Sequence, residues 1–215
     1  MTTVAIMQPY FVPYAGYFRL FAAADVVALL DCVQFPRRGW VHRNQLPDAG
    51  GQPRWLTLPL AKAPQTAHIA EMTLATDAAA RLAEAMRRFP SLAMNQPLRG
   101  AVADAGGTLV PYLERTLGVA CETLGLPFRT IRTSSLSIDP GLRAEDRILA
   151  IAERLGAATY LNLAGGRDLY DSEHFAARGI TLRFLDDWQG SYWSILHRLM
   201  CEPAADIAAD IRAQC

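Results

Sequence analysis

Lysine is almost missing from this chain: twenty of its 21 basic residues are arginine, and Lys62 is the only lysine. Enzymes that form a Schiff base, or that hold phosphate with a P-loop, need a lysine in a particular setting. Lys62 lies in the ordinary segment PLAKAPQ, so these two mechanisms are set aside. A GC-rich genome accounts for the arginine bias at least as well as any function does.

An excess of charge of one sign is also lacking, because 21 basic and 21 acidic side chains cancel. A balanced chain has no electrostatic footprint for a polyanion, so we expect neither a nucleic-acid partner nor an anionic membrane surface. No apolar run approaches the roughly 20 residues that span a bilayer, and no secretory signal opens the sequence. The four cysteines show no C-x-x-C spacing, which favours reduced thiols and a cytoplasmic location.

Signatures of several catalytic classes are missing as well. His68, His174 and His197 are isolated, without the spacing to cysteine or carboxylate residues that indicates a metal site. No G-x-S-x-G segment indicates a serine nucleophile. We therefore expect no metal and no cofactor.

What is present indicates a globular α/β protein. Hydrophobic residues make up 51% of the 215 residues, enough for a sizeable core, and no linker divides the chain, so we expect a single α/β domain over residues 1–215. Strands alternate with helices, which predicts a mostly parallel central sheet flanked by helices, Rossmann-like, with a nucleotidyltransferase-like variant left open. Strands are expected over 4–7, 26–30, 128–133, 159–161 and 180–185, helices over 16–23, 77–88, 98–124 (broken at Gly106 and Gly107), 143–155 and 171–178, and a hairpin around 48–51.

Polar and aromatic residues follow four of these strands, and ligands bind beyond the carboxyl ends of the strands in such a sheet. The first group lies in MQPYFVPYAGYF, where two prolines and five aromatic residues stand in place of a short polar turn, as expected for the floor of a ligand site. The predicted ligand-binding residues are Gln8, Tyr10, Tyr14, Gln34, Arg38, Arg43, Asn44, Ser134, Asn162, Gly165, Gly166 and Tyr170, and the catalytic candidates are His42, Asp31 and Tyr17. We expect Tyr10, Tyr14, Tyr17, Asp31 and Arg43 to line one concavity with parts of segment 162–170.

The residue types suggest the roles. An arginine suits a bidentate contact to phosphate or carboxylate, so Arg43 and Arg38 would hold an anionic group. Tyr14 and Tyr17 would stack on the substrate or form hydrogen bonds with it. His42 or Asp31 would move a proton. Structural readings stay open beside these: packing for the tyrosines, a turn cap for Asp31, a surface position for His42, and a ligand-free turn for the glycines.

Three segments, AIMQPYFVPYAGYFRLF, DCVQFPRRGWVHRNQL and YLNLAGGRDLYDSEHFAARGITLRFL, together resemble the WbqC-like protein family. The resemblance implies a cytoplasmic component of surface-polysaccharide (O-antigen) gene clusters or of small-molecule pathways. The positions that match the family's shared residues are Gln8, Pro9, Tyr10, Tyr14, Gly16, Tyr17, Asp31, Gln34, Phe35, Arg43, Asn44, Tyr160, Gly165, Gly166 and Tyr170. The chain departs from the family in WSILHRLM, where His197 stands at a place for which an acidic residue is expected.

A second likeness is one of position. Nucleotidyltransferases of the His-x-Gly-His type carry that motif at the place of YAGY here, but phenols are neutral at pH 7 and cannot replace an imidazolium in charge stabilisation. The leading hypothesis is a transferase acting on an activated small molecule: a nucleotide-linked sugar, an acyl donor or an aminoacyl donor. The alternative is a non-catalytic ligand-binding or scaffold protein of a biosynthetic assembly. A homo-oligomer and a complex with another enzyme of the pathway are both left open.

Overall fold

Five parallel strands form the central sheet of the computed structural model, which describes residues 2–94 and 96–215. They are β1 (Thr2–Met7), β2 (Val26–Leu29), β5 (Thr130–Arg132), β6 (Ala157–Asn162) and β7 (Thr181–Phe184), in the order β5-β2-β1-β6-β7. The chain builds outward from β1 to one edge and then returns to build the other edge, so the order reverses between β1 and β6. This is the α/β, Rossmann-like arrangement that the sequence predicts.

The two faces of the sheet feed two separate hydrophobic cores because successive strand side chains point to opposite sides. In β1, Ala5 packs into the larger core, whereas Val4 and Ile6 pack into the smaller one. In β6, Leu161 packs into the larger core and Tyr160 into the smaller one.

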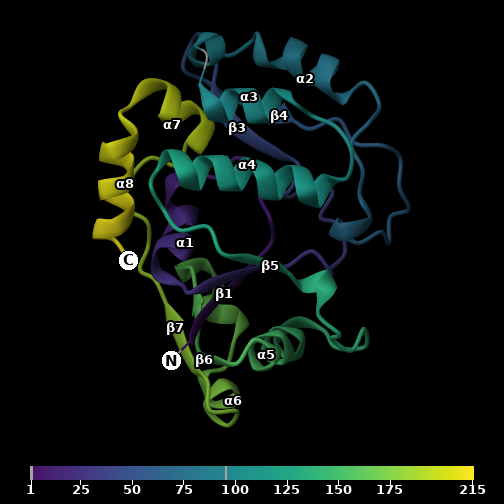
Figure 1. Ribbon diagram of the computed structural model, residues 1–215, viewed down its shortest axis with the longest axis vertical. Coiled ribbons are helices and arrows are strands. Elements are labelled where there is room, and N and C mark those ends of the chain that lie inside the picture. The colour runs from purple at the N-terminus through teal and green to yellow at the C-terminus, as the bar shows by residue number, and fades with distance from the viewer. Residues whose placement is uncertain (1, 95) are drawn as a thin grey trace.

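Helices cover both faces of the sheet (Figure 1). On the larger core lie a 3-10 turn η1 (Ala15–Phe18), the helix α1 (Arg19–Ala23) and the long helix α4 (Leu109–Thr123). On the smaller core lie α5 (Ala144–Arg154) and α6 (Ser172–Ala176).

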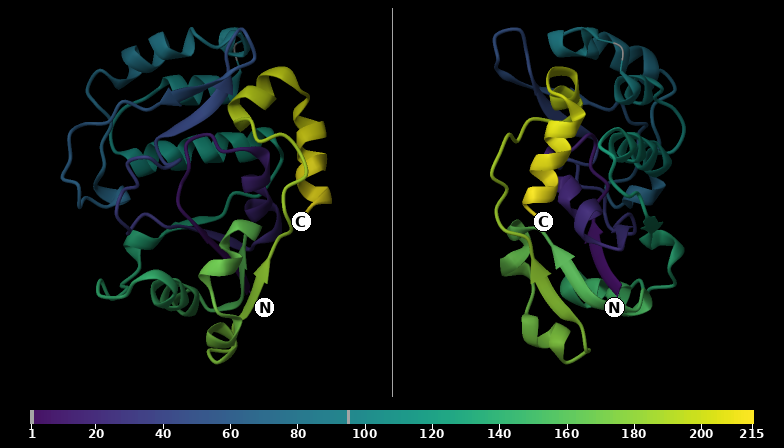
Figure 2. Two further views of the ribbon diagram at one scale, coloured as in Figure 1. Left: turned by 180° about the vertical axis from the view of Figure 1, so that it is seen from behind. Right: turned by 60° about the vertical axis from the view of Figure 1, so that its left-hand side comes forward.

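A further layer lies beyond α4, on the side away from the sheet (Figure 2). It contains the antiparallel hairpin β3 (Arg43–Pro47) and β4 (Pro53–Thr57), with α2 (Ala78–Met86) and α3 (Pro97–Ala103). The remaining short 3-10 segments are η2 (Ile69–Glu71), η3 (Pro90–Ala93), η4 (Thr133–Ser135) and η5 (Ala164–Leu169).

Most expected elements are confirmed within a few residues. The helical region 98–124 divides into α3 and α4 at the Gly106–Gly107 break, and Thr108 is the residue before α4. The two last helices, α7 (Ile195–Cys201) and α8 (Ala204–Ala213), have no counterpart among the predicted elements. No helix in residues 2–94 and 96–215 combines the length and apolar character needed to cross a bilayer.

Candidate functional site

Asp31 follows β2, and its side chain connects the end of β2 to the residues that follow β5. The side chain is buried, and both carboxylate oxygens accept hydrogen bonds: Oδ1 from Thr133 Oγ1 at 3.0 Å and Ser134 N at 2.7 Å, Oδ2 from Ser134 Oγ at 2.6 Å. Two predicted site residues, Asp31 and Ser134, are thus neighbours. Their contacts are with each other, and these contacts hold two strand ends at the edge where ligands bind.

Asn44 ties the segment after β1 to the hairpin. Its buried amide donates through Nδ2 to the carbonyls of Phe11 at 3.0 Å and Val12 at 2.9 Å. Val12 has a φ of 38°, a left-handed conformation that a β-branched residue adopts only when its surroundings enforce it. Ser194 Oγ also donates to the Val12 carbonyl, at 2.6 Å. These bonds direct segment 8–14 away from the sheet and onto β3.

Arg43 is engaged within its own turn. Its guanidinium donates to the carbonyls of Arg38 at 2.6 Å and Gly39 at 3.4 Å, and lies 4.2 Å from the centre of the Trp55 ring. Arg38 is exposed and lines a shallow concavity with Gln34. The two arginines expected to hold an anion therefore do not converge on one point.

Tyr17 lies in the larger core and contacts the backbone of the partly buried Gln8. Tyr17 is fully buried, and its hydroxyl donates to the Gln8 carbonyl at 2.8 Å. Burial, with a smaller effect of Tyr10, raises the pKa of Tyr17 well above its usual value, so the phenol stays protonated at neutral pH. Tyr17 lines none of the cavities described below.

The glycine segment after β6 is shaped by close packing. A Cβ at Gly166 would lie 2.5 Å from Nδ2 of Asn162, which itself donates to the Tyr160 hydroxyl at 3.0 Å. A Cβ at Gly165 meets nothing within 4 Å. Position 166 therefore requires glycine, because a side chain there would collide with Asn162.

The segment after β1 lines a cavity of about 690 Å³, which we call the aromatic cavity. This size is typical of a small-molecule site. Its lining residues are Tyr10, Pro13, Tyr14, Trp40, Asn44, Gln45, Pro53, Ser191, Tyr192 and Trp193, none of them charged at neutral pH. Burial raises the pKa of Tyr10 and of Tyr14, so both phenols are neutral hydrogen-bonding groups there.

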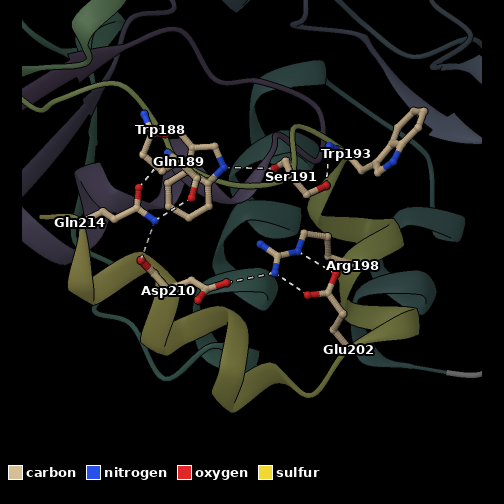
Figure 3. Close-up of polar contacts among 8 residues, drawn as sticks. All are labelled: Trp188, Gln189, Ser191, Trp193, Arg198, Glu202, Asp210 and Gln214. Carbon is tan, nitrogen blue, oxygen red and sulfur yellow. Dashed lines mark hydrogen bonds and ion pairs between the residues drawn. The ribbon is translucent and has the colours of Figure 1, made fainter.

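The C-terminal helices fix the segment that supplies Ser191, Tyr192 and Trp193 (Figure 3). Gln214 holds this segment, because its Oε1 accepts from Gln189 N at 2.8 Å and its Nε2 donates to the Gln189 carbonyl at 3.1 Å. Trp188 Nε1 donates to the Ser191 carbonyl at 3.1 Å. One wall of the aromatic cavity thus depends on residues close to the C-terminal end of the described chain.

Arg198 forms two ion pairs below that segment, one with Glu202 at the end of α7 and one with Asp210 of α8, and the second joins the two helices. Arg198 is buried and pairs with Glu202, and its Nη2 lies 3.3 Å from Asp210 Oδ2 (Figure 3). The neighbouring His197 has its Nδ1 at 3.0 Å from Ser91 Oγ and lines none of the cavities described in this section. The segment in which an acidic residue was expected therefore contributes to the packing of helices.

A second cavity, of about 560 Å³, lies at the carboxyl ends of the strands, and we call it the strand-edge cavity. The cavity is lined by residues that follow β2, by the segment before η2, by the loop after β5, by the start of α5, and by η5 with the residue after it. The lining residues are Leu30, Val33, Gln34, Thr66, His68, Pro140, Arg143, Ala144, Glu145, Arg147, Ile148, Leu169 and Tyr170. An adjoining cavity of about 250 Å³ shares His68, Pro140 and Arg147 and extends to Ser134.

The strand-edge cavity carries two guanidinium groups that form no ion pair with a carboxylate of the described residues, and together they outnumber its one acidic group. Arg147 is buried and donates to the carbonyls of Cys32 at 2.6 Å, Leu142 at 3.0 Å and Pro140 at 3.0 Å. Arg143 donates to the carbonyls of Pro140 and Leu142. Among residues 2–94 and 96–215 neither arginine forms an ion pair, so the cavity keeps both positive charges.

Glu145 is the acidic group of this cavity. It lies in the first turn of α5, where its Oε2 accepts from Asp171 N at 2.5 Å and its Oε1 lies 2.6 Å from Nδ1 of His174. The hydrogen bond to Glu145, helped by Asp171, raises the pKa of the exposed His174. A carboxylate coupled to an imidazole, with His68 on the same cavity, gives this site groups that can move protons.

His42 lines another concavity, of about 400 Å³, together with Phe35. The imidazole lies against the Phe35 ring, with ring centres 5.1 Å apart, and its Nδ1 is buried without a partner among the described residues. Burial first, and the nearby charge of Arg43 second, lower the pKa of His42 to about 4. The ring is therefore neutral at pH 7.

The predicted site residues are thus divided, and the single concavity expected from the sequence is not formed. Tyr10, Tyr14 and Asn44 line the aromatic cavity, whereas Gln34 and Tyr170 line the strand-edge cavity. The reason is the course of segment 8–14, which Asn44 attaches to the hairpin. The residues predicted from the strand ends do not include His68, Arg143, Glu145 and Arg147, although IDPGLR continues the loop after β5. They also do not include Trp40, Gln45, Ser191, Tyr192 and Trp193, although DWQGSYWS is visibly rich in aromatic residues.

The depressed pKa of His42 makes stability depend on pH in a defined window. Between pH 6.5 and about 4 the unfolded chain takes up a proton at His42 and the folded chain does not, so the free energy of unfolding should fall as pH falls through this window. We expect urea unfolding of the His42→Gln variant to show a shallower decline between pH 6.5 and 4.5 than the native chain. Equal declines in the two proteins would contradict the burial of a neutral imidazole.

Among residues 2–94 and 96–215 no group of three or more His, Cys, Asp or Glu side chains has the arrangement of a metal site. The groups available for a ligand are therefore the guanidiniums, the carboxylate and the imidazole of the strand-edge cavity, and the amides and phenols of the aromatic cavity.

Comparison with known proteins shows the family to which the chain belongs. The chain matches the WbqC-like protein family over residues 8–194 and belongs to that family, which confirms the resemblance seen in its motifs. It is 25% identical over 200 residues to an uncharacterized protein of Mycobacterium tuberculosis, a match that covers 86% of this chain and 83% of that protein. No solved structure matches the chain.

Proposed function

We propose that this protein is a transferase that binds an anionic, activated small molecule in the strand-edge cavity. The observation that carries the proposal is the pair Arg143 and Arg147, two guanidinium groups without a carboxylate partner at the carboxyl ends of parallel strands. In open α/β sheets this edge is where ligands bind. The order of the sheet reverses between β1 and β6, and Tyr170, which follows β6 and η5, lines the cavity.

The charges favour a phosphate-bearing or carboxylate-bearing substrate. Both arginines are held in place by backbone carbonyls, so they present positive charge without having to be ordered when the ligand arrives. The N-terminal turn of α5 lies beside them, and its unpaired N–H groups carry a partial positive charge that adds to the charge of the two arginines. An activated donor such as a nucleotide-linked sugar, an acyl phosphate or an aminoacyl donor has the required charge, and surface-polysaccharide or small-molecule biosynthesis in the cytoplasm is the setting that we propose.

Proton transfer in this proposal falls to Glu145 and His68. Transfer of a group to a hydroxyl or an amine requires that the acceptor lose a proton, and a carboxylate or imidazole within hydrogen-bond reach can take it. Glu145 is oriented by His174 at 2.6 Å and by the Asp171 amide, so its position is fixed. Asp31 also has both oxygens engaged, by Thr133 and Ser134, but unlike Glu145 it is not among the residues that line the strand-edge cavity, so in this proposal it positions the cavity wall.

A thermal-shift screen tests the proposal. Nucleotides, nucleotide sugars, acyl phosphates and aminoacyl donors are each added at about 100 times the dissociation constant, where a true ligand stabilises by about 2.7 kcal/mol and raises Tm by about 5–10 °C. We expect Arg143→Gln to weaken binding of the ligand found by at least about tenfold, because a charge-assisted hydrogen bond is lost.

The matched control is Arg154→Gln, which changes an exposed arginine at the other end of the same helix. This variant should bind like the native chain. Glu145→Gln should keep binding while losing turnover, measured as loss of donor and gain of product by mass spectrometry. Equal affinities in Arg143→Gln and Arg154→Gln would refute the assignment of the anion site.

A non-catalytic binding protein is the second candidate, and the aromatic cavity favours it. That cavity is larger, at about 690 Å³, and its lining contains no carboxylate, imidazole or guanidinium group. Its ligand would be uncharged and held by stacking on Tyr14, Tyr192 and Trp193. If Tyr192→Ala removes all ligand binding and Arg143→Gln leaves it unchanged, the binding function replaces the enzymatic one.

A further inference from the structure

The concavity around His42 differs from the two cavities discussed above in its charge. Its lining contains three cations, Arg37, Lys62 and Arg81, and no acidic residue. The remaining lining residues are Phe35, His42, Thr57, Leu58, Pro59, Leu60, Ala61 and Met72. We refer to it as the cationic cavity. It brings the chain's single lysine next to two arginines from distant parts of the sequence.

Local contacts leave most of this positive charge available. Arg37 donates through Nη2 to the carbonyls of Ala63 at 2.8 Å and Pro64 at 2.9 Å, which orders its guanidinium without neutralising it. Arg81 forms a long ion pair with Asp77, at 3.6 Å, in which both side chains are more than half exposed. An ion pair of this length on the surface contributes little and is screened by salt.

His42 supplies a hydrogen-bonding group beside the three cations. Nδ1 is the buried atom, so Nε2 is the nitrogen left toward the cavity that the ring lines. The ring is thus poised to offer one N–H to a group bound among the three cations.

We propose that the cationic cavity binds a phosphate group, with Arg37, Lys62 and Arg81 contributing charge and His42 donating from Nε2. A phosphate dianion offers several acceptor oxygens and matches the excess of positive charge better than a single carboxylate does. The volume of about 400 Å³ leaves room for the molecule that carries the phosphate. The site is separate from the strand-edge cavity, with which it has no lining residue in common.

Titration with inorganic phosphate at pH 7.5 tests the site directly. The probe is the NMR signal of the His42 ring, identified by its loss in the His42→Gln variant. We expect a saturable shift of this signal and a rise of the His42 pKa from about 4, because a bound anion favours the proton that burial now opposes. Sodium chloride at equal ionic strength should not reproduce either effect.

Charge removal provides the second measurement, by equilibrium dialysis with labelled phosphate. Lys62→Gln and Arg81→Gln should each weaken phosphate binding about fivefold, as expected for one partly exposed charge contact. Arg87→Gln is the matched control, since Arg87 follows the same helix α2 and does not line the cavity. Dialysis does not depend on His42, so it decides the question even if His42→Gln does not fold. Absence of saturable binding, equal effects of chloride, or equal losses in Arg81→Gln and Arg87→Gln would overturn the proposal.

Discussion

Replacing Asp31 with alanine is expected to lower the free energy of unfolding by about 3 kcal/mol, because its charge-assisted hydrogen bonds are lost and Ser134 N and Oγ are left without this acceptor, whereas Thr133 Oγ1 can still donate to the Leu29 carbonyl. The donors are Thr133 Oγ1, Ser134 N and Ser134 Oγ, at 2.6–3.0 Å from a carboxylate that is 1% exposed. These bonds close the sheet between the ends of β2 and β5. Urea unfolding measured by circular dichroism checks the value.

Asp25 offers a matched control at the other end of β2. It is exposed and accepts one hydrogen bond, from Thr3 N at 2.8 Å. Asp25→Ala should therefore lower the free energy of unfolding by less than about 1 kcal/mol. If Asp31→Ala unfolds like the native chain and only ligand turnover is lost, the carboxylate is a catalytic group, as the sequence suggests, and its contribution to the fold is small.

Much of the fold could be predicted because it depends on local patterns. Short apolar runs such as Val4 to Met7, followed by helical periodicity, indicate parallel strands with crossovers, and Gly106–Gly107 marks the break between α3 and α4. Helix α7, at Ile195–Cys201, was missed because it is short and is stabilised by packing and by the ion pair of Arg198 with Asp210 of α8, a contact between elements that leaves no periodic signal. Helix α8 does carry a helical spacing, since Ile207 and Ile211 are both buried, and this spacing was overlooked.

The site was predicted less well because the rule on strand ends identifies an edge of the sheet and says nothing about the direction in which each loop leaves it. Asp31, Gln34 and Tyr170 do lie at that edge. Tyr10 and Tyr14 leave it, because the hydrogen bonds of Asn44 and Ser194 carry their segment to the hairpin. Contacts between residues more than 30 positions apart decide this course.

Asn44→Ala is the second substitution for which a large effect is expected. It tests whether the conformation of MQPYFVPYAGYF depends on hydrogen bonds from other segments of the chain. The variant loses both bonds to the Phe11 and Val12 carbonyls and the bond from Gln45 N to Oδ1 at 2.7 Å. Because the amide is buried, we expect a loss of about 3 kcal/mol in the free energy of unfolding. Val12 should then leave its strained conformation at φ 38°, and the aromatic cavity should lose its shape.

A substitution of the neighbouring Gln45 serves as the control, because it removes a side chain from the cavity lining without removing the hydrogen bonds that shape the loop. Gln45 also lines the aromatic cavity but is only partly buried, so Gln45→Ala should change the free energy of unfolding by less than about 1 kcal/mol. Urea unfolding measures stability, and the fluorescence of Trp40 and Trp193, two of the four tryptophans, reports on the cavity. We expect Asn44→Ala to change both and Gln45→Ala to change neither strongly. If Asn44→Ala keeps native stability and native fluorescence, then the prolines at 9 and 13, each fixing φ near −65°, are sufficient to hold the loop, and its shape is set by its own sequence.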